Sequence, residues 1–302
     1  MNMTFTKTFI EKNYIKISDQ DNGLLLMRIY DKNARIMYCS GDESIIKAGE
    51  KAALEMGKSL MVYDFPGSLE GMSDVLNSLG YTCKNGKKIM SVNTKELFSS
   101  TGVTKSMKIP FRNAQWAPFR DLLVYQFEEI LNILKEQKIP IDRYALDRFD
   151  DDLSGVVYDN DQRPQAVILS SVYGKEILVE LLLGFNKNNP EYVMASMQGF
   201  AKELIDGDML DIYDIITMFE LNNSISPLLK RLLDKEYDLF ESGYAVHAEK
   251  KLSQPESYND IEMTEKEPFG RFVLSEEARS SYQDNINAKM QWQIDEIKTM
   301  EA

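Results

Sequence analysis

One carboxylate stands alone in an otherwise aliphatic segment, and it is a candidate for acid–base chemistry. Glu180 lies in the middle of ILVELLL, residues 177–183. A carboxylate that faces a cleft and is shielded by aliphatic side chains becomes a stronger base than one in water. The other interpretation places it on the solvent-exposed face of a half-buried strand. The local pattern does not separate the two.

A polar loop follows this segment and leads into a helix, which is a position where proteins bind phosphate. Free backbone N–H groups and the positive helix end attract anions, and glycine lets the backbone come close. The loop begins at Leu183 and Gly184 and ends at Asn189. Only one glycine is present and Pro190 removes an amide, so the sequence predicts a weak phosphate site in which Lys187 adds a positive charge.

Aspartates crowd the region before the strands of the second half of the chain. They are Asp142, Asp147, Asp150, Asp151, Asp152, Asp159 and Asp161. A cluster of this charge attracts cations such as amines. The alternative is a set of solvated loops on an already acidic protein.

Histidine and cysteine are scarce, which excludes several kinds of site. His247 is the only histidine, and Cys39 and Cys83 are the only cysteines. A His/Cys-rich metal site and a disulfide framework are therefore not expected. A serine hydrolase would have to use His247, which lies in the alternating segment GYAVHAEK and reads as a sheet or surface residue.

The overall charge and hydropathy indicate a soluble protein. The 302 residues carry a net charge of −13, which disfavours sequence-independent binding to nucleic acid. No apolar run approaches the roughly 20 residues of a membrane span. The N-terminus lacks the apolar block of a signal peptide, so a reduced cytoplasm is the expected location, without membrane association.

The elements that would position these residues occur twice. Each half shows strands, a helix, an apolar strand, a second helix and a two-strand ending. Such a repeat predicts two related α+β units. The predicted domains are residues 1–100, residues 101–250, and residues 251–302 as an irregular connection and a C-terminal helix.

The first unit is predicted from its turns and apolar periodicity. Strands flank the turn at 31–33, and a helix at 43–56, a strand at 60–63 and a helix at 69–79 follow. Asn85-Gly86 predicts a two-residue hairpin turn within 81–92. The small polar residues 99–108 read as a linker.

The second unit is predicted in the same way. A helix spans about 119–134 with Pro118 in its first turn, before strands at 156–158, 166–171 and 177–183. A helix opens at Asn189-Pro190, and a buried strand spans 215–219. A last helix at 227–233 and closing strands at 237–248 complete the unit.

The final helix, about residues 275–300, carries one apolar stripe. It either docks on one of the two units or forms a contact with a partner, such as a second copy in a homodimer.

The order of elements in the second unit resembles that of the GNAT family of acyl-CoA-dependent N-acetyltransferases. The ending VLNSLGY of a first-unit helix is also similar to the Leu-Gly-Phe/Tyr ending common in that family. The resemblance implies an α+β fold of two GNAT-like units, each a mixed, mostly antiparallel sheet flanked by helices. The first unit is truncated at its front because it lacks the opening helices.

The resemblance also implies a chemistry in which acetyl-CoA is the co-substrate and no metal is needed. Glu180 stands on the third strand, where the family often has its base. The family loop Gln/Arg-x-x-Gly-x-Gly/Ala, which holds the pyrophosphate of acetyl-CoA, corresponds to 184–191. The resemblance therefore implies a set of cofactor contacts in and beside this loop: Leu183, Gly184, Phe185, Lys187, Asn188 and Asn189, with Asn222 at the start of the last helix as a further contact. In the family fold the aspartate-rich region borders the acceptor site, so the resemblance implies Asp150, Asp151 and Asp152 as contacts of a cationic amine. The expected tyrosine acid is missing there, and Ser226 is the catalytic candidate that remains, with Ser224 as an alternative. Tyr192 on the neighbouring helix is a further alternative, although an aromatic residue at a helix start more often serves packing.

Two functions are compatible with these features. The first is an N-acyltransferase that moves an acetyl group to a primary amine of a small cationic molecule or a peptide. The second is an inactive GNAT-like binding or regulatory module. In the first unit, Asp42 and Glu43 lie where phosphate would bind, so that unit is predicted to be non-catalytic.

Overall fold

The chain divides into two units, Met1–Glu267 and Pro268–Ala302, and the computed structural model describes most of the first. The described residues are 3–266 without 12–13, 21–22, 66–71, 101–102, 104, 106, 140, 142–145, 147, 187–188, 220–237 and 254–257. The predicted helices at 227–233 and 275–300 lie outside them.

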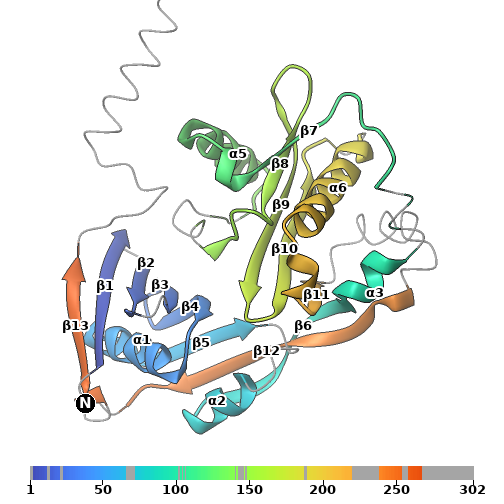
Figure 1. Cartoon of the computed structure of the whole chain (residues 1–302). Coiled ribbons are helices and arrows are strands. Elements are labelled where there is room, and N and C mark those ends of the chain that lie inside the picture. Colours follow the sequence, from blue (N-terminus) through green and yellow to red (C-terminus); the bar gives the residue numbers. More distant parts are fainter. Residues whose placement is uncertain are drawn as a thin grey trace, which may run out of the picture. The chain divides into compact units, whose positions relative to one another are not determined.

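Thirteen described strands form one mixed, mostly antiparallel sheet (Figure 1). Their order across the sheet is β13-β1-β2-β3-β4-β5-β12-β6-β11-β10-β9-β8-β7. Helices pack against this sheet, so the predicted α+β class is confirmed.

The first repeat follows the prediction closely. Its elements are β1 (Met3–Glu11), β2 (Tyr14–Ser18), β3 (Leu24–Ile29), β4 (Asn33–Ser40), α1 (Glu43–Glu55), β5 (Leu60–Phe65) and α2 (Met72–Ser78). The strands β1 to β4 are antiparallel neighbours, and β5 lies parallel to β4 after the α1 crossover. Only residues 12–13 separate β1 from β2, so this repeat has no room there for an opening helix.

The second repeat has the same order with a helix added. Its elements are β7 (Gln115–Pro118), a 3-10 turn η1 (Phe119–Asp121), α5 (Val124–Glu136), β8 (Gly155–Tyr158), β9 (Pro164–Tyr173), β10 (Glu176–Gly184), α6 (Pro190–Asp206), η3 (Met209–Asp211) and β11 (Ile215–Phe219). Pro118 therefore ends a strand, and the helix predicted from about 119 begins at Val124. The three predicted strands and the helix at Pro190 are confirmed.

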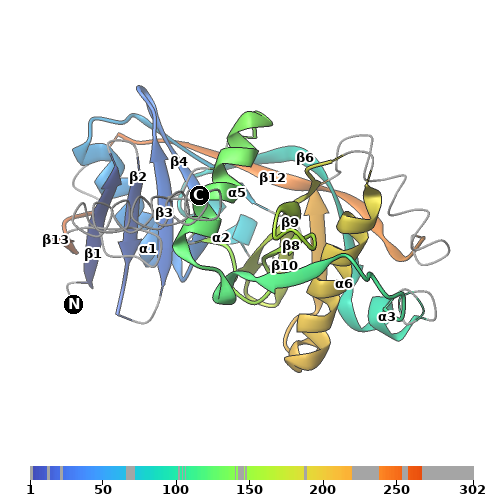
Figure 2. The same ribbon diagram turned by 90° about the horizontal axis from the view of Figure 1, so that it is seen from above.

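The two repeats exchange their closing strands. The strand β6 (Thr82–Asn93) pairs with β11 of the second repeat, and β12 (Glu241–Lys251) pairs with β5 of the first. The exchanged strands also pair with each other and lie side by side in Figures 1 and 2. The boundaries predicted at residues 100 and 250 place β6 in the first unit and β12 in the second. In the sheet, each of these strands pairs with a strand of the other repeat, and the two repeats are joined in this way.

The predicted hairpin turn at Asn85-Gly86 is wrong, because β6 runs straight through it. The pairing with β12 shifts register between Tyr244 and Val246, and β6 carries the extra residue at this point. A Cβ on Gly86 would lie 3.0 Å from the carbonyl oxygen of Ala245. The glycine thus permits a close strand approach at a β-bulge, which is another frequent use of glycine in strands.

Two segments predicted to be irregular contribute to the fold. The predicted linker supplies Val103, which is buried in the core of the second repeat, and α3 (Thr94–Ser99) precedes it. The connection after residue 250 contains β13 (Ile261–Lys266), which pairs in parallel with β1.

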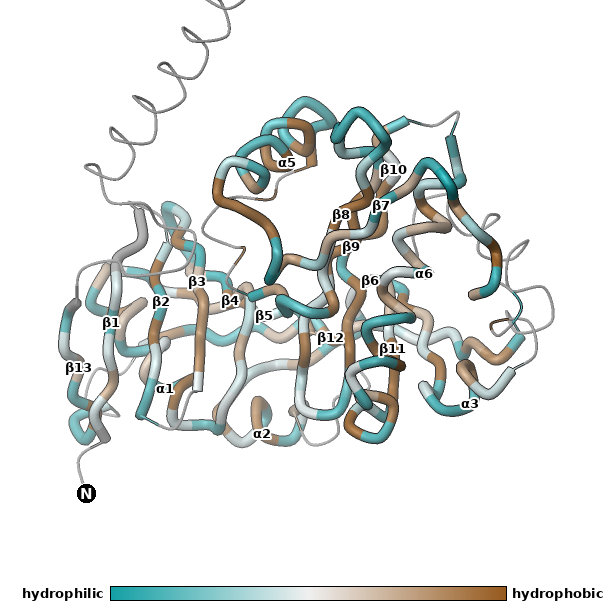
Figure 3. Tube along the Cα trace, turned by 45° about the horizontal axis from the view of Figure 1, so that its top comes forward, coloured by the Kyte–Doolittle hydropathy of each residue, from teal (hydrophilic) through white to brown (hydrophobic). Residues whose placement is uncertain are grey.

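The core is divided between the repeats. One apolar cluster packs α1 on β2 to β5, and another packs α6 and α3 on β6 and β8 to β11. Figure 3 shows hydrophobic residues along the central strands and hydrophilic residues in many of the connections. None of the described helices is long and apolar enough to cross a membrane.

Candidate functional site

Each repeat has a β-bulge on the strand before its crossover helix, and the two bulges are equivalent. In β10 the register against β9 shifts between Val179 and Leu181, so Glu180 is the extra residue. In β4 the register against β3 shifts in the same way, and Met37 is the extra residue. Each of these two residues directly follows the last residue of its strand that pairs with the neighbouring parallel strand, which is β11 for Glu180 and β5 for Met37. The repeat therefore places a carboxylate in the second copy where the first has a thioether.

The structure places Glu180 in a polar contact that the sequence did not indicate. Its Oε2 accepts from Nη2 of Arg148 at 2.6 Å, and its Oε1 accepts from Oγ of Ser171 at 2.5 Å. The Arg148 and Glu180 side chains are only 9% and 14% exposed. Both carboxylate oxygens thus have partners within the protein. Arg148 lies 32 residues away and has no sequence signal beyond its opposite charge.

Tyrosines from both repeats surround this ion pair. Tyr38 of β4 donates to the carbonyl of Val172 at 3.0 Å, and its ring centroid lies 5.2 Å from that of Tyr173. Burial raises the pKa of Tyr38, and it raises those of Tyr63 and Tyr173 well above the ordinary value, with a smaller contribution from Glu180. These phenols are therefore neutral at physiological pH.

The two parallel strands of the second repeat separate next to Glu180. The strands β10 and β11 pair from Glu176–Ile215 to Val179–Met218. Beyond that point β10 continues beside β9 to Gly184, and the described part of β11 ends at Phe219. Among the described residues, β10 therefore has no pairing partner in β11 beyond Val179.

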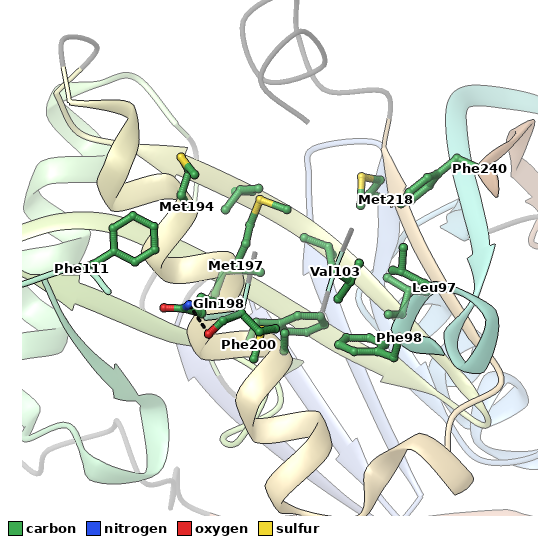
Figure 4. A pocket seen from close by; sticks show the side chains of 16 residues that line it. Leu97, Phe98, Val103, Phe111, Met194, Met197, Gln198, Phe200, Met218 and Phe240 are labelled. Carbon is green, nitrogen blue, oxygen red and sulfur yellow. Dashed lines mark hydrogen bonds between the residues drawn. The ribbon is translucent and has the colours of Figure 1, made fainter. Parts of the chain in front are cut away.

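An apolar cavity of about 100 Å³ lies against this separation, between the strands and α6 (Figure 4). Its wall includes Val179 and Leu182 of β10 and Ile216 and Met218 of β11. The rest of the lining is rich in methionine and phenylalanine: Met194, Met197, Phe200, Phe98, Phe111 and Phe240. Such a lining suits an apolar group, and methionine adapts to its shape.

One polar side chain lines the cavity, and it is engaged. Nε2 of Gln198 donates to the carbonyl oxygens of Met107 and Ile109 at 2.7 and 3.1 Å, and the first of these bonds is dashed in Figure 4. Gln198 thereby holds the segment after α3 against α6.

The loop after β10 shows why its glycine is there. A Cβ on Gly184 would lie 2.7 Å from Cγ2 of Val193, so the residue allows α6 to pack closely. The amide of Phe185 donates to the carbonyl of Gln165 at 2.8 Å, and Leu183 pairs with Val167. Among the predicted cofactor contacts, Lys187, Asn188 and Asn222 lie outside the described residues, as does the catalytic candidate Ser226.

The two crossover helices differ at their N-termini. In α1, Oδ1 of Asp42 accepts from the Ser44 hydroxyl and from the Ser44 amide, the latter at 2.8 Å, and these two hydrogen bonds lower the pKa of Asp42. In α6, the N-cap Asn189 makes no side-chain capping hydrogen bond, and the helix begins with Pro190 and Glu191. In the first repeat, the carboxylate of Asp42 thus occupies the N-terminus of α1. In the second repeat, Asn189 does not cap α6 in this way.

The predicted acceptor aspartates have partners inside the chain. Oδ1 of Asp150 accepts from the amides of Asp152 and Leu153 at 3.0 and 2.9 Å, and burial raises its pKa. Asp152 forms an ion pair with Arg120, which also binds Glu203 at 2.7 Å. Two of the three aspartates therefore shape this loop, and their role in binding an amine stays a prediction, as does that of Asp151.

The single histidine belongs to a cross-strand network on β12. Nδ1 of His247 lies 2.6 Å from Asp64, which also pairs with Arg35 at 3.2 Å. No group of three potential metal-binding side chains of the His, Cys, Asp and Glu types occurs among the described residues.

Comparison with known proteins gives similarity of structure only. No protein-family model and no curated protein matches the chain. A solved tandem GNAT protein from the clavulanic acid biosynthesis pathway is similar with 7% identity and a TM-score of 0.45, over 80% of this chain and 83% of that chain.

Two further solved structures are similar at the same level. The structure of L-PGS from Bacillus licheniformis has 12% identity and a TM-score of 0.47, over 80% of this chain and 85% of that chain. The C-terminal domain (DUF2156) of a putative lysylphosphatidylglycerol synthetase from Agrobacterium fabrum has 10% identity and a TM-score of 0.46, over 78% and 83%. None of the three assigns a role to a residue of this chain.

Proposed function

We propose that the second repeat transfers an acyl group from a thioester donor of the acyl-CoA type to an amine. The observation that carries this proposal is the separation of β10 from β11 beside an apolar cavity. A donor of this type carries its thioester on an extended arm that contains amide groups. Such an arm can form hydrogen bonds with a free strand edge, as an added β-strand does. The apolar end of such an arm would then lie against Val179, Leu182 and Met218.

The chemistry needs a polarised thioester and a base. The bulge at Glu180 turns backbone groups away from regular pairing, which makes them available to a thioester carbonyl. The amine nitrogen attacks that carbonyl, the C–S bond breaks, and the thiolate leaves. Glu180 is the proposed base; since both its oxygens have partners, the amine must approach a remaining lone pair or displace Ser171.

The N-terminus of α6 supports a phosphate contact only in part. Its N-cap is open, unlike that of α1, but Pro190 lacks an N–H and Glu191 is acidic. We therefore expect most of the donor's binding free energy to come from the arm.

A second candidate function is a binding module that keeps the fold without the chemistry. The ion pair of Glu180 with Arg148 favours it, because a buried pair of this kind also serves as a purely structural contact between a strand and a loop.

Thermal unfolding with acetyl-CoA tests the first candidate. A ligand that binds only the native state must raise the melting temperature by mass action, so millimolar acetyl-CoA should raise it by several degrees. Met194→Trp, which fills the cavity, should abolish the shift, and Met209→Trp, on a partly buried methionine outside the lining, should keep it. No shift in the parent protein would favour the binding module.

A further inference from the structure

A second cavity, of about 340 Å³, lies in the first repeat, far along the sheet from the acyl site. It is bordered by α1, the end of α2 and the end of β12. Three lysines line it, Lys47, Lys250 and Lys251, together with Ser78 and Ser253.

A buried triad forms one wall of this cavity. Glu50 is fully buried, and its Oε2 accepts from Nζ of Lys250 at 2.7 Å and from the Tyr258 hydroxyl at 2.6 Å. Burying a carboxylate is costly unless it is paired, and an apolar residue would fill the same space more cheaply. The triad has one clear geometric effect, which is to fix the Lys250 ammonium at the cavity wall.

The charges around this wall add up to an anion-binding environment. Burial and the adjacent Glu50 carboxylate raise the pKa values of Tyr81 and Tyr258, so both phenols are neutral. Of the three lysines of the lining, Lys250 pairs with Glu50 and Lys47 pairs with Glu43 at 3.2 Å, so the local charge is one positive, in a protein whose net charge is −13. Lys250 is 19% exposed and uses one of its three donors on Glu50.

We propose that this cavity binds a small molecule that carries a phosphate group. A phosphate offers several strong acceptor oxygens, enough for three ammonium groups and the Ser253 hydroxyl, whereas a single carboxylate would leave donors unpaired. The Ser78 hydroxyl already donates to the carbonyl of Val75 at 2.7 Å. The volume exceeds that of a free phosphate ion, which leaves room for a small polar body. The site is independent of the proposed acyl transfer.

Calorimetric titration with inorganic phosphate and with pyrophosphate, at constant ionic strength, tests this site. Lys47→Ala/Lys251→Ala removes two surface ammonium groups and leaves the buried triad intact. We expect saturable binding to the parent protein that is at least tenfold weaker in this double variant. The matched control Lys32→Ala/Lys108→Ala removes the same charge at exposed positions and should bind within twofold of the parent.

Co-sedimentation with phosphatidic acid vesicles separates the two sources of the phosphate. Binding of the soluble anions without sedimentation assigns a soluble ligand, and lysine-dependent sedimentation without soluble binding assigns a lipid headgroup. Failure of both, or equal weakening in the two double variants, would overturn the proposal.

Discussion

Glu180 and Met37 occupy the same place in the two repeats, each as the extra residue of a bulge beside a separating strand pair. The internal comparison therefore restricts the candidate chemistry to the second repeat. It also makes the role of Glu180 testable, because a glutamine there keeps the size of the side chain and one acceptor oxygen for Arg148, and removes its basicity.

We expect Glu180→Gln to lower the rate of acyl transfer at least about 100-fold while donor binding stays within twofold, since general-base catalysis contributes this much. The rate is measured as release of CoA, and binding by titration. Glu191→Gln, on the exposed first turn of α6, is the control and should keep its turnover. Unchanged turnover in Glu180→Gln would remove Glu180 as the base.

The two thiols should differ in reactivity. Burial raises the pKa of Cys39 to about 12, and Cys83 is only partly buried. Because the thiolate is the reactive form, a thiol reagent at pH 8 should modify Cys83 alone in the native protein and both cysteines in urea. Mass spectrometry of the labelled peptides measures this, and native labelling of Cys39 would contradict the buried position of β4.

At the scale of elements, two glycines are explained by the close approach of a neighbouring strand or helix, which secondary-structure propensity alone does not predict. Gly86 permits the bulge between β6 and β12, and Gly184 lets α6 pack on the end of β10. The sequence predicted most helices and strands of both repeats, because each has a clear apolar period. It could not distinguish a glycine at a turn from a glycine under a neighbouring strand, because the neighbour is distant in the chain.

Gly199 in α6 provides a test of this view. A Cβ there would lie 2.3 Å from the ring of Trp116, whose Nε1 donates to Glu203 at 3.2 Å. We expect Gly199→Ala to lower the free energy of unfolding by about 1–3 kcal/mol through overpacking, although alanine favours a helix. Gly243→Ala, where the nearest atom would be 3.6 Å away, should change it by less than about 1 kcal/mol. Urea denaturation measures both, and equal effects would refute a role for the ring contact.

At the scale of the whole molecule, the strand exchange makes the two repeats depend on each other. The strand β5 has β12 as its outer neighbour, and β11 has β6. A repeat cut off at residue 100 would keep β6 without β11 and leave β5 without β12, exposing unpaired strand edges.

We therefore expect a fragment of residues 1–100 to be unfolded by circular dichroism, and a fragment of residues 101–302 to aggregate or unfold. Co-expression of both fragments should restore a folded complex. A chain ending at residue 267 is the control and should fold, because it contains the whole compact unit. A stably folded 1–100 fragment would show that the repeats are independent domains.

The sequence by itself determined the repeat, the α+β class and the order of the elements, because these depend on local periodicity and turn residues. It also singled out Glu180. Only the tertiary structure showed that Glu180 is a bulge residue bound to Arg148 and Ser171, that the repeats exchange β6 and β12, and that a lysine-lined cavity lies over Glu50. These features depend on contacts between residues far apart in the chain, and a one-dimensional pattern does not encode which distant strand or side chain becomes the neighbour.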